Sequence, residues 1–309
     1  MIPLILRARH FPVPDVAVLR LAHRDALALP VAGAGASIGL QGPGGLPQRR
    51  YSLLGCDDGW ELAVRWDGAS RGLARHLHRD LAVGGGIMAQ PPGPGMQIDR
   101  RAPRVLAIAG GIGVTPFLSL GARARQLGVP FELHHIHRWA GDPPLGAALR
   151  RILGPDLHLH GPGLRPDLLS LLAGQPLGTR LMVCGPPPLM SACLAAAHQL
   201  GWPAHHVQTE RFGLTQAGGS PFTAELPDGR RVDVGPDQTL LQVLLGHGLP
   251  ISHMCGIGIC GQCRIRVAAP PGGVDHRDQV LDDHERAAGD CMMSCVSRPR
   301  GSWLRILSD

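Results

Sequence analysis

Three cysteines within nine residues are the feature of this sequence most specific for one kind of chemistry. The stretch 252–263 reads SHMCGIGICGQC and spaces Cys255, Cys260 and Cys263 as C-x4-C-x2-C. With a distant fourth cysteine, this spacing is that of a plant-type [2Fe–2S] cluster, in which thiolates hold the irons. Small residues between the thiolates let backbone N–H groups approach the sulfides. The glycines placed to do this are Gly256, Gly258 and Gly261.

Other interpretations of this stretch are weaker. Its GIGICG satisfies the G-x-G-x-x-G dinucleotide fingerprint, but that fingerprint needs a strand before its glycines and a helix after them. Here a predicted helix, and not a strand, precedes the glycines. Zinc sites usually pair C-x2-C with a second such pair or with histidines, and the sequence holds no second pair. A packed cysteine trio without metal is the remaining alternative.

The length of the loop beyond Cys263 does not decide which cysteine is the fourth ligand. Cys291 and Cys295 lie 28 and 32 residues beyond Cys263, and closing a loop over either span differs negligibly in entropy. Cys295 lies in the apolar run MMSCV, as expected for a buried strand beside a cluster, whereas Cys291 follows a predicted turn at Gly289-Asp290. We therefore expect Cys295 to be the ligand. The other cysteines fall in other predicted folding units: Cys56, Cys184 and Cys193.

A glycine-rich turn predicts a dinucleotide site. Residues 109–116, AGGIGVTP, follow the apolar run RVLAIAG and open a predicted helix. Such a turn brings backbone N–H groups and a helix N-terminus to a pyrophosphate, and a turn shaped by glycines for geometry alone is the alternative. Cys184, in VCGP, ends a later strand and therefore faces the same sheet edge. On its own it is typical of a small buried residue.

The motif RRYS forms a third candidate site, at the end of a predicted strand. Arg49 is suited to a phosphate, while Tyr51 and Ser52 offer an aromatic face and a hydroxyl to a flavin ring. Taken alone, the motif favours an exposed arginine pair and a half-buried tyrosine.

These motifs lie on three segments with different patterns. Residues 1–100 hold short alternating runs with Gly/Pro punctuation, which predict a small antiparallel barrel or sandwich. From residue 104, five strand-like runs alternate with helical stretches, the pattern of a parallel α/β sheet with its ligand edge at the strand carboxyl ends. Residues 213–219, GLTQAGG, have linker composition, and beyond them a hairpin with a DG turn, a helix and a last strand, WLRIL, are predicted. The helices of the middle segment are expected around 116–127, 143–153, 165–173 and 186–200.

Composition narrows the class of protein. With 309 residues, 44% of them hydrophobic, the chain can fill two or three domain cores. No apolar run approaches the ~20 residues of a membrane span, so we expect a cytoplasmic protein with no membrane contact, in which eight cysteines indicate metal or redox chemistry. The formal charge is +6, with +8 in residues 1–220 and −2 beyond them, and no basic stripe or aromatic platform predicts nucleic-acid binding.

The sixteen histidines show no ligand spacing. His158 and His160 alternate along a predicted strand, and we expect them to be solvated or packed and not to bind metal.

In their order along the chain, RxYS, GGIGVTP, VCGPPPLM, ERFG and the cysteine loop make this sequence resemble the phthalate dioxygenase reductase and vanillate demethylase reductase family. The resemblance covers nearly the whole chain and is most specific in CGIGICGQC, VDHRDQVL and MMSCVSR. It implies an FMN-binding antiparallel β-barrel at 1–101, an NAD-binding parallel α/β domain at 102–213 and an α+β, β-grasp ferredoxin domain at 221–309. Such a chain is expected to be a monomer that passes electrons to a Rieske-type oxygenase.

The resemblance also implies residue roles. Arg49 would hold the flavin phosphate, Tyr51 would pack on the flavin, and Ser52 would form a hydrogen bond near its N5 atom. Cys184 would lie beside the nicotinamide, and Phe212 of ERFG would line the flavin face. The residues matching the dinucleotide site are Gly110, Gly111 and Thr115, and those matching the cluster ligands are Cys255, Cys260, Cys263 and Cys295.

Two departures from the family concern the flavin. Arg71-Gly72-Leu73-Ala74 stands where the family commonly has R-G-G-S, so Ala74 replaces a serine that helps to grip the phosphate. The usual P-R-N-x-F loop is reduced to PPGPG at 91–95. These departures bear on flavin affinity more than on flavin identity.

The expected cofactors are chemically consistent with one another. NADH gives up two electrons as a hydride, and an iron–sulfur cluster accepts one at a time, so a flavin must stand between them. No set of residues for oxygenating an organic substrate is evident, which implies an external acceptor. A reductase for a cytochrome P450 or another acceptor, and a redox-sensing carrier without efficient flavin turnover, are the alternatives. NADH is the expected donor, with Asp142 near enough to bind a ribose 2′-hydroxyl, whereas Arg138 would favour NADPH.

Overall fold

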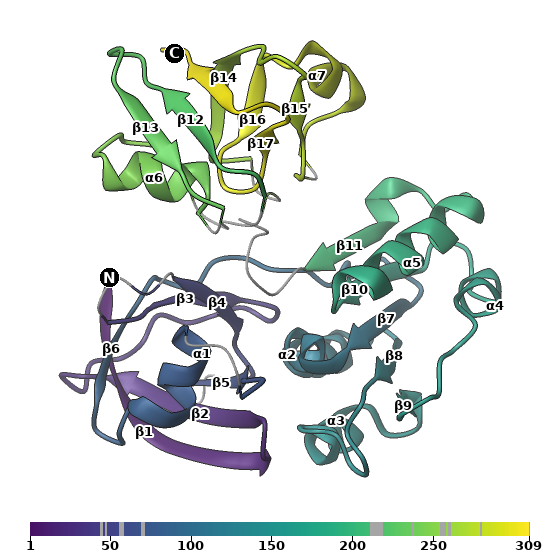
Figure 1. Ribbon diagram of the computed structural model, residues 1–309. Coiled ribbons are helices and arrows are strands. Elements are labelled where there is room, and N and C mark those ends of the chain that lie inside the picture. Colours follow the sequence, from purple (N-terminus) through teal and green to yellow (C-terminus); the bar gives the residue numbers. More distant parts are fainter. Residues whose placement is uncertain are drawn as a thin grey trace. The chain divides into compact units, whose positions relative to one another are not determined.

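The computed structural model describes the chain except for residues 44, 45, 47, 56–58, 69–71, 211–218, 237, 254–257, 259, 260, 279 and 309. The chain forms two compact units, residues 1–212 and 213–309, and each is described by itself. Figure 1 labels their helices and strands. In the part of the chain that the structure describes, no helix is both long enough and apolar enough to cross a membrane.

The first sheet of residues 1–212 is antiparallel and has the strand order β4-β3-β6-β1-β2-β5. Strand β2 reads VAVLRLAH, with little polar alternation, because both of its faces are buried. Ala17 and Leu19 belong to the core enclosed by this sheet, whereas Val16 and Val18 belong to a second core that includes Phe117. The strands are β1 (Ile2–Val13), β2 (Val16–His23), β3 (Ser37–Gln41), β4 (Arg49–Ser52), β5 (Trp60–Arg65) and β6 (Gly86–Ala89).

The outer strands of this sheet are β4 and β5. Among the described residues no ladder joins them, and an isolated bridge between Gly55 and Glu61 links the segment after β4 to β5. Short helical segments α1 (Leu73–Arg75) and η1 (His76–Asp80) place Leu73 and Leu77 in the enclosed core. The antiparallel sheet is present as predicted, and its closure into a barrel stays a prediction.

The second sheet is parallel throughout, in the order β11-β10-β7-β8-β9. Its central strand β7, VLAIAG, is buried on both faces, since alternate side chains meet different helices. Val105 and Ala107 share a core with α2 and α3, while Leu106 and Ile108 share a core with α4 and α5, on opposite faces of the sheet (Figure 1). The five strands and four helices expected after residue 104 are therefore present.

The elements of this half are β7 (Val105–Gly110), η2 (Gly111–Val114), α2 (Thr115–Leu127), β8 (Phe131–Ile136), α3 (Gly146–Leu153), η3 (Gly154–Asp156), β9 (Leu157–His160), α4 (Leu168–Ala173), β10 (Arg180–Cys184), α5 (Pro187–Gln199), η4 (Ala204–His206) and β11 (Val207–Glu210). Except for Gly219, the predicted linker lies outside the described residues.

Residues 213–309 contain a five-stranded sheet in the order β13-β12-β18-β14-β16 and a two-stranded sheet, β15-β17. The predicted hairpin is the antiparallel pair β12 and β13, and the last strand, β18, runs parallel to β12. Helix α6 begins at a capping box between Thr239 and Gln242 and packs Leu240 and Leu244 into the core. The elements are β12 (Phe222–Glu225), β13 (Arg231–Val234), α6 (Leu240–Gly246), β14 (Arg264–Ala268), β15 (Val274–Asp275), α7 (Asp283–Ala288), β16 (Cys291–Met293), β17 (Arg298–Pro299) and β18 (Trp303–Ile306).

Candidate functional site

The RRYS motif is divided between the two faces of strand β4. Successive side chains of a strand point to opposite faces, so Arg49 and Tyr51 share one face while Arg50 and Ser52 share the other. Burial raises the pKa of Tyr51, which therefore stays neutral, and lowers the pKa of Arg49. Arg50 donates hydrogen bonds to the Ser37 hydroxyl, 2.7 Å from Nη2 and 3.1 Å from Nε, and so braces β3 against β4.

Ser52 meets the glycine turn of the parallel sheet. The Thr115 Oγ1 hydroxyl lies 3.4 Å from Ser52 Oγ and 3.1 Å from the carbonyl oxygen of Ile112, and both hydroxyl-bearing residues are buried. Thr115 is the first residue of α2. The fold therefore brings the predicted flavin-binding hydroxyl to the predicted dinucleotide turn.

Glycines at this turn are required by close packing and by backbone conformation. A Cβ on Gly113 would lie 2.5 Å from the carbonyl oxygen of Cys184, and one on Gly110 would lie 2.5 Å from Pro186. Gly111 has φ +54°, and no described atom lies within 4 Å of the place where its Cβ would be. The turn thus packs tightly on the end of β10 at Gly110 and Gly113 and leaves space at Gly111, where a ligand can approach the backbone.

His135 forms a hydrogen bond with the backbone of this turn. It lies on β8, fully buried, with Nε2 2.9 Å from the carbonyl oxygen of Gly111. Burial lowers the pKa of His135 to about 4, so the ring is neutral near pH 7 and its Nε2–H donates to that carbonyl. Among the described residues, its Nδ1 has no hydrogen-bond partner. The sequence pattern offered no sign of this role.

Cys184 and Glu210 are direct neighbours at the carboxyl ends of β10 and β11. Both are buried. Burial, with Glu210 nearby, raises the pKa of the Cys184 thiol, so Cys184 is present as the thiol. Burial raises the pKa of Glu210 to about 7, although Arg50 opposes the rise, and Glu210 Oε2 finds no hydrogen-bond partner among the described residues. A carboxyl group that titrates near neutral pH can hold or release a proton at this edge.

The cysteine site lies in residues 213–309. Cys263 and Cys295 are buried, and a hydrogen bond from Cys295 lowers the pKa of the Cys263 thiol to about 6. Ser294 fixes the relation between them, since its backbone N–H and its hydroxyl both donate to the Cys263 carbonyl, at 3.0 and 2.9 Å. Two thiols are therefore held side by side, as ligands of one cluster must be.

Cys291 has different surroundings, although it is equally buried. It opens β16 and is paired with Arg266 on β14. Burial raises the pKa of its thiol, and the charged groups that act on it are Arg264, Asp290 and Glu285. The hydrogen bond between Cys263 and Cys295 is consistent with Cys295 as the fourth ligand, which stays a prediction.

The loop that contacts Gly258 is built around Asp278. Gly258 and Gly261, within that stretch, have φ of +75° and +74°, and a Cβ on Gly258 would lie 2.7 Å from Val296 and 3.0 Å from the Asp278 backbone. Only glycine fits this conformation at such an approach. The VDHRDQVL motif therefore packs closely against Gly258.

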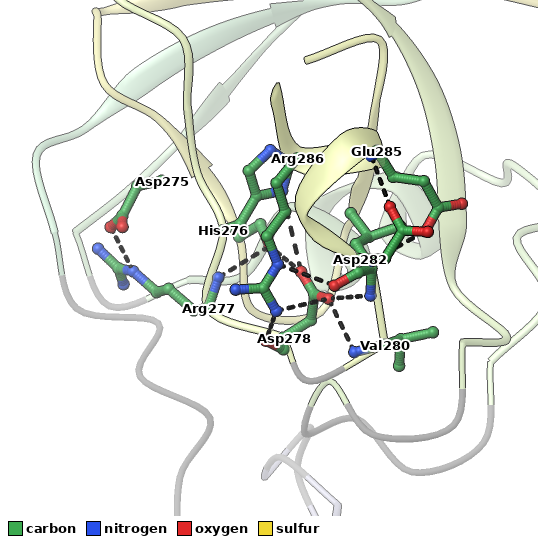
Figure 2. Close-up of polar contacts among 10 residues, drawn as sticks. Asp275, His276, Arg277, Asp278, Val280, Asp282, Glu285 and Arg286 are labelled. Atoms are coloured by element: carbon green, nitrogen blue, oxygen red, sulfur yellow. Dashed lines mark hydrogen bonds and ion pairs between the residues drawn. The ribbon is translucent and has the colours of Figure 1, made fainter. Parts of the chain in front are cut away.

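Hydrogen bonds hold the Asp278 loop in place. The buried Asp278 carboxylate accepts from the backbone N–H groups of Val280 and Leu281, at 3.0 and 2.9 Å, and Arg286 Nη2 donates to the Asp278 carbonyl at 2.8 Å (Figure 2). Arg286 also donates from Nε to the Leu281 carbonyl, 2.9 Å away. Asp282 begins α7 with a capping box, which anchors the far end of the loop (Figure 2).

Several predicted site residues lie outside the described residues: Cys255, Cys260, Gly256, Phe212 and Arg71. Ala74 is partly buried against the core of the antiparallel sheet. The residues that sequence reasoning missed are Glu210, His135 and Asp278. Glu210 and Asp278 lay within the recognised motifs ERFG and VDHRDQVL, so their place in those motifs was the available signal.

Comparisons with known proteins agree with this arrangement. Residues 224–300 match Fer2, described as a 2Fe-2S iron-sulfur cluster binding domain. The chain is 37% identical to the heme-dependent oxidative N-demethylase beta subunit of Ectopseudomonas mendocina, over 92% of this chain and 93% of that protein. It is 30% identical to the vanillate O-demethylase oxidoreductase of Acinetobacter baylyi, over 98% and 97%.

Among solved structures, phthalate dioxygenase reductase matches with a TM-score of 0.80 and 27% identity, over 99% of this chain and 97% of that one. That protein is described as a modular structure for electron transfer from pyridine nucleotides to [2Fe–2S]. The fold and the cysteine site thus define an electron-transferring oxidoreductase with more than one domain. More narrowly, the chain belongs to the reductase family that includes vanillate O-demethylase oxidoreductase and phthalate dioxygenase reductase.

Proposed function

We propose that this chain takes a hydride from NADH onto FMN and passes the electrons through a [2Fe–2S] cluster to an oxygenase component. The observation that carries the proposal is the contact of Ser52 with Thr115, because it joins the RxYS strand to the glycine turn. When bound, a flavin accepts a hydride and releases its electrons singly, which links NADH to a one-electron acceptor.

At the dinucleotide end, the glycine turn and the strand ends have different roles. The turn at Gly110, Gly111 and Thr115 offers backbone N–H groups and the start of α2 to the pyrophosphate. Cys184 and Glu210, at the ends of adjacent strands, border the place of the nicotinamide. Their burial excludes water there, and the neutral thiol and the carboxyl of Glu210 leave this edge without a fixed negative charge below pH 7.

At the flavin end, the faces of β4 supply different groups. Arg49 is assigned to the flavin phosphate and Tyr51 to the ring. Ser52 is assigned to a hydrogen bond near the N5 atom, and Phe212 to the face of the ring. The space beside Gly111 and the buried hydroxyls of Ser52 and Thr115 fit this arrangement.

At the cluster, we assign Cys255, Cys260, Cys263 and Cys295 as ligands. The adjacent thiols of Cys263 and Cys295 fit the soft donors that iron requires. Three domains follow from these assignments: a flavin-binding antiparallel barrel at 1–101, a nucleotide-binding α/β domain at 102–213 and a β-grasp ferredoxin domain at 221–309. The antiparallel sheet, the parallel sheet and the Fer2 match at 224–300 support them.

The proposal is tested by the spectrum, the cofactors and the activity of the purified chain. We expect flavin absorption, iron close to two per chain, and reduction of cytochrome c that depends on NADH. Flavin released by heat should be FMN on a column, and kcat/KM should be higher for NADH than for NADPH. A chain without flavin and without NADH-dependent reduction would instead be a redox-sensing carrier.

For the acceptor, we propose a Rieske-type oxygenase, supported by the likeness to vanillate O-demethylase oxidoreductase and phthalate dioxygenase reductase. A heme-containing acceptor is the second candidate, because the relative at 37% identity is named a heme-dependent oxidative N-demethylase subunit. Electron transfer to a purified Rieske oxygenase component and to a purified cytochrome P450, compared at equal concentration, separates the two. A monomeric chain and a cytoplasmic location stay predictions, and gel filtration and cell fractionation test them.

A further inference from the structure

A cluster of three side chains on the outer half of the parallel sheet lies apart from the electron path proposed above. Glu132 and His134 belong to β8 and His158 belongs to β9, and one ligand-type atom from each lies within 4.8 Å of the others. His134 is paired directly with His158 in the ladder, and Glu132 is two residues before His134. All three side chains therefore project from the same face of the sheet.

We propose that Glu132, His134 and His158 bind a divalent transition-metal ion such as Zn²⁺. Both imidazoles present Nε2 to the same carboxylate oxygen: Glu132 Oε1 lies 2.8 Å from His134 Nε2 and 3.6 Å from His158 Nε2. Nitrogen and oxygen ligands about 2.0–2.1 Å from a tetrahedral zinc ion are separated by roughly 3.3 Å. The two distances bracket that value.

Two neighbours orient these ligands. Arg104 Nη1 donates to Glu132 Oε2 at 2.9 Å, which leaves Oε1 to face the imidazoles. His160 Nε2 lies 2.9 Å from His134 Nδ1. Histidines that bind metals usually donate their other ring N–H to a neighbour, which fixes the ring and its tautomer. With an ion on Nε2, His134 carries its proton on Nδ1 and donates it to His160.

The ligand chemistry selects the class of ion. Two imidazoles and one carboxylate suit zinc and its neighbours in the first transition row, whereas calcium and magnesium prefer oxygen ligands alone. The His158 side chain is 44% exposed, while those of Glu132 and His134 are 13% and 9% exposed. Solvent can therefore supply the fourth ligand on the His158 side. Strand β9 is the outer strand of its sheet, so an ion bound by residues of both strands would stabilise its pairing with β8.

The test is zinc titration of the full chain, purified without a histidine tag and with its cluster loaded. Iron is measured before and after the titration, so that zinc entering an emptied cysteine site is recognised. Calorimetry should show one zinc ion per chain, no comparable binding of Mg²⁺, and a rise in the thermal midpoint with zinc. His158→Ala should weaken zinc binding at least tenfold and remove the rise in midpoint.

The matched control is His198→Ala, since His198 is exposed on α5 and should leave zinc binding unchanged. Glu132→Gln keeps the shape of the side chain but loses its charge, and should also weaken binding at least tenfold. Equal zinc affinity in the wild type and in His158→Ala, or no saturable binding by the wild type, would overturn the proposal.

Discussion

The hydroxyl of Thr115, at the start of α2, lies 3.4 Å from the hydroxyl of Ser52, at the end of β4. This contact joins the antiparallel sheet to helix α2 of the α/β half, through two residues 63 positions apart in the sequence. It orients a buried hydroxyl at the place where the proposed flavin and dinucleotide sites meet.

Ser52→Ala should slow reduction of the flavin by NADH about 10²-fold, because a positioned donor near the atom that accepts the hydride is lost. The variant should fold normally, since the change removes one hydroxyl. Stopped-flow absorption measures the rate, and Ser119→Ala is the control, because Ser119 lies on α2 and bonds Gly35 instead. Reduction of Ser52→Ala at the wild-type rate would remove Ser52 from the mechanism.

Cys184→Ala should slow the same step about tenfold or more and leave flavin and iron contents unchanged. The residue ends β10 beside Glu210 and is packed under the glycine turn, so its loss disturbs the position of the nicotinamide and of neither prosthetic group. Cys193→Ala, another buried cysteine of this unit, is the control for packing alone. If both variants reduce flavin equally fast, Cys184 serves packing only.

Glu210 should make flavin reduction depend on pH near 7. Its pKa is raised from 4.5 to about 7 by burial, so the carboxyl is neutral below pH 7 and becomes charged above it. A buried negative charge opposes electron arrival at a neighbouring flavin, and the rate should therefore fall as the pH rises through 7. Glu210→Gln keeps the neutral form and should flatten this profile; an unchanged inflection would assign it to another group.

The raised pKa of Glu210 also makes the free energy of unfolding depend on pH. A carboxyl whose pKa is higher in the folded chain binds more protons there than when unfolded, so its contribution to stability declines between pH 4.5 and 7. Glu210→Gln should remove that decline from the free energy of unfolding.

His135 should make the chain less stable in mild acid. Its pKa is lowered from 6.5 to about 4 by burial, so the unfolded chain binds the proton first and stability falls as the pH drops from 6.5 to 4. The loss is on the order of 3 kcal/mol, from 1.36 kcal/mol for each pKa unit. Urea unfolding of the wild type and of His135→Gln across this range measures the difference, which should shrink toward pH 4. A constant difference would contradict the assignment.

Cys295→Ala should abolish the visible absorption and the electron paramagnetic resonance signal of the cluster, while NADH still reduces the flavin. Cys291→Ala should do neither. The comparison is matched, because the two cysteines are 1% and 2% exposed and both changes remove one buried sulfur atom. The opposite pattern would make Cys291 the ligand.

Features that depend on residue type and short spacing were determined by the sequence itself. The C-x4-C-x2-C spacing, the alternating runs and the glycine turn after β7 follow from ligand geometry, side-chain periodicity and backbone sterics, all of which act over a few residues. The choice of Cys295 over Cys291 also came from local apolar context, and it stays a prediction.

Tertiary structure decided which distant side chains meet and how far each is removed from water. The pKa of Glu210 depends on burial by groups far along the chain, and His135 gains its role only because β8 lies beside β7. Glu132 and His134 on β8 meet His158 on the adjacent strand β9, so no spacing along the chain marks them. Charge, burial and proximity are properties of the folded chain, because they are set by neighbours in space and not by neighbours in sequence.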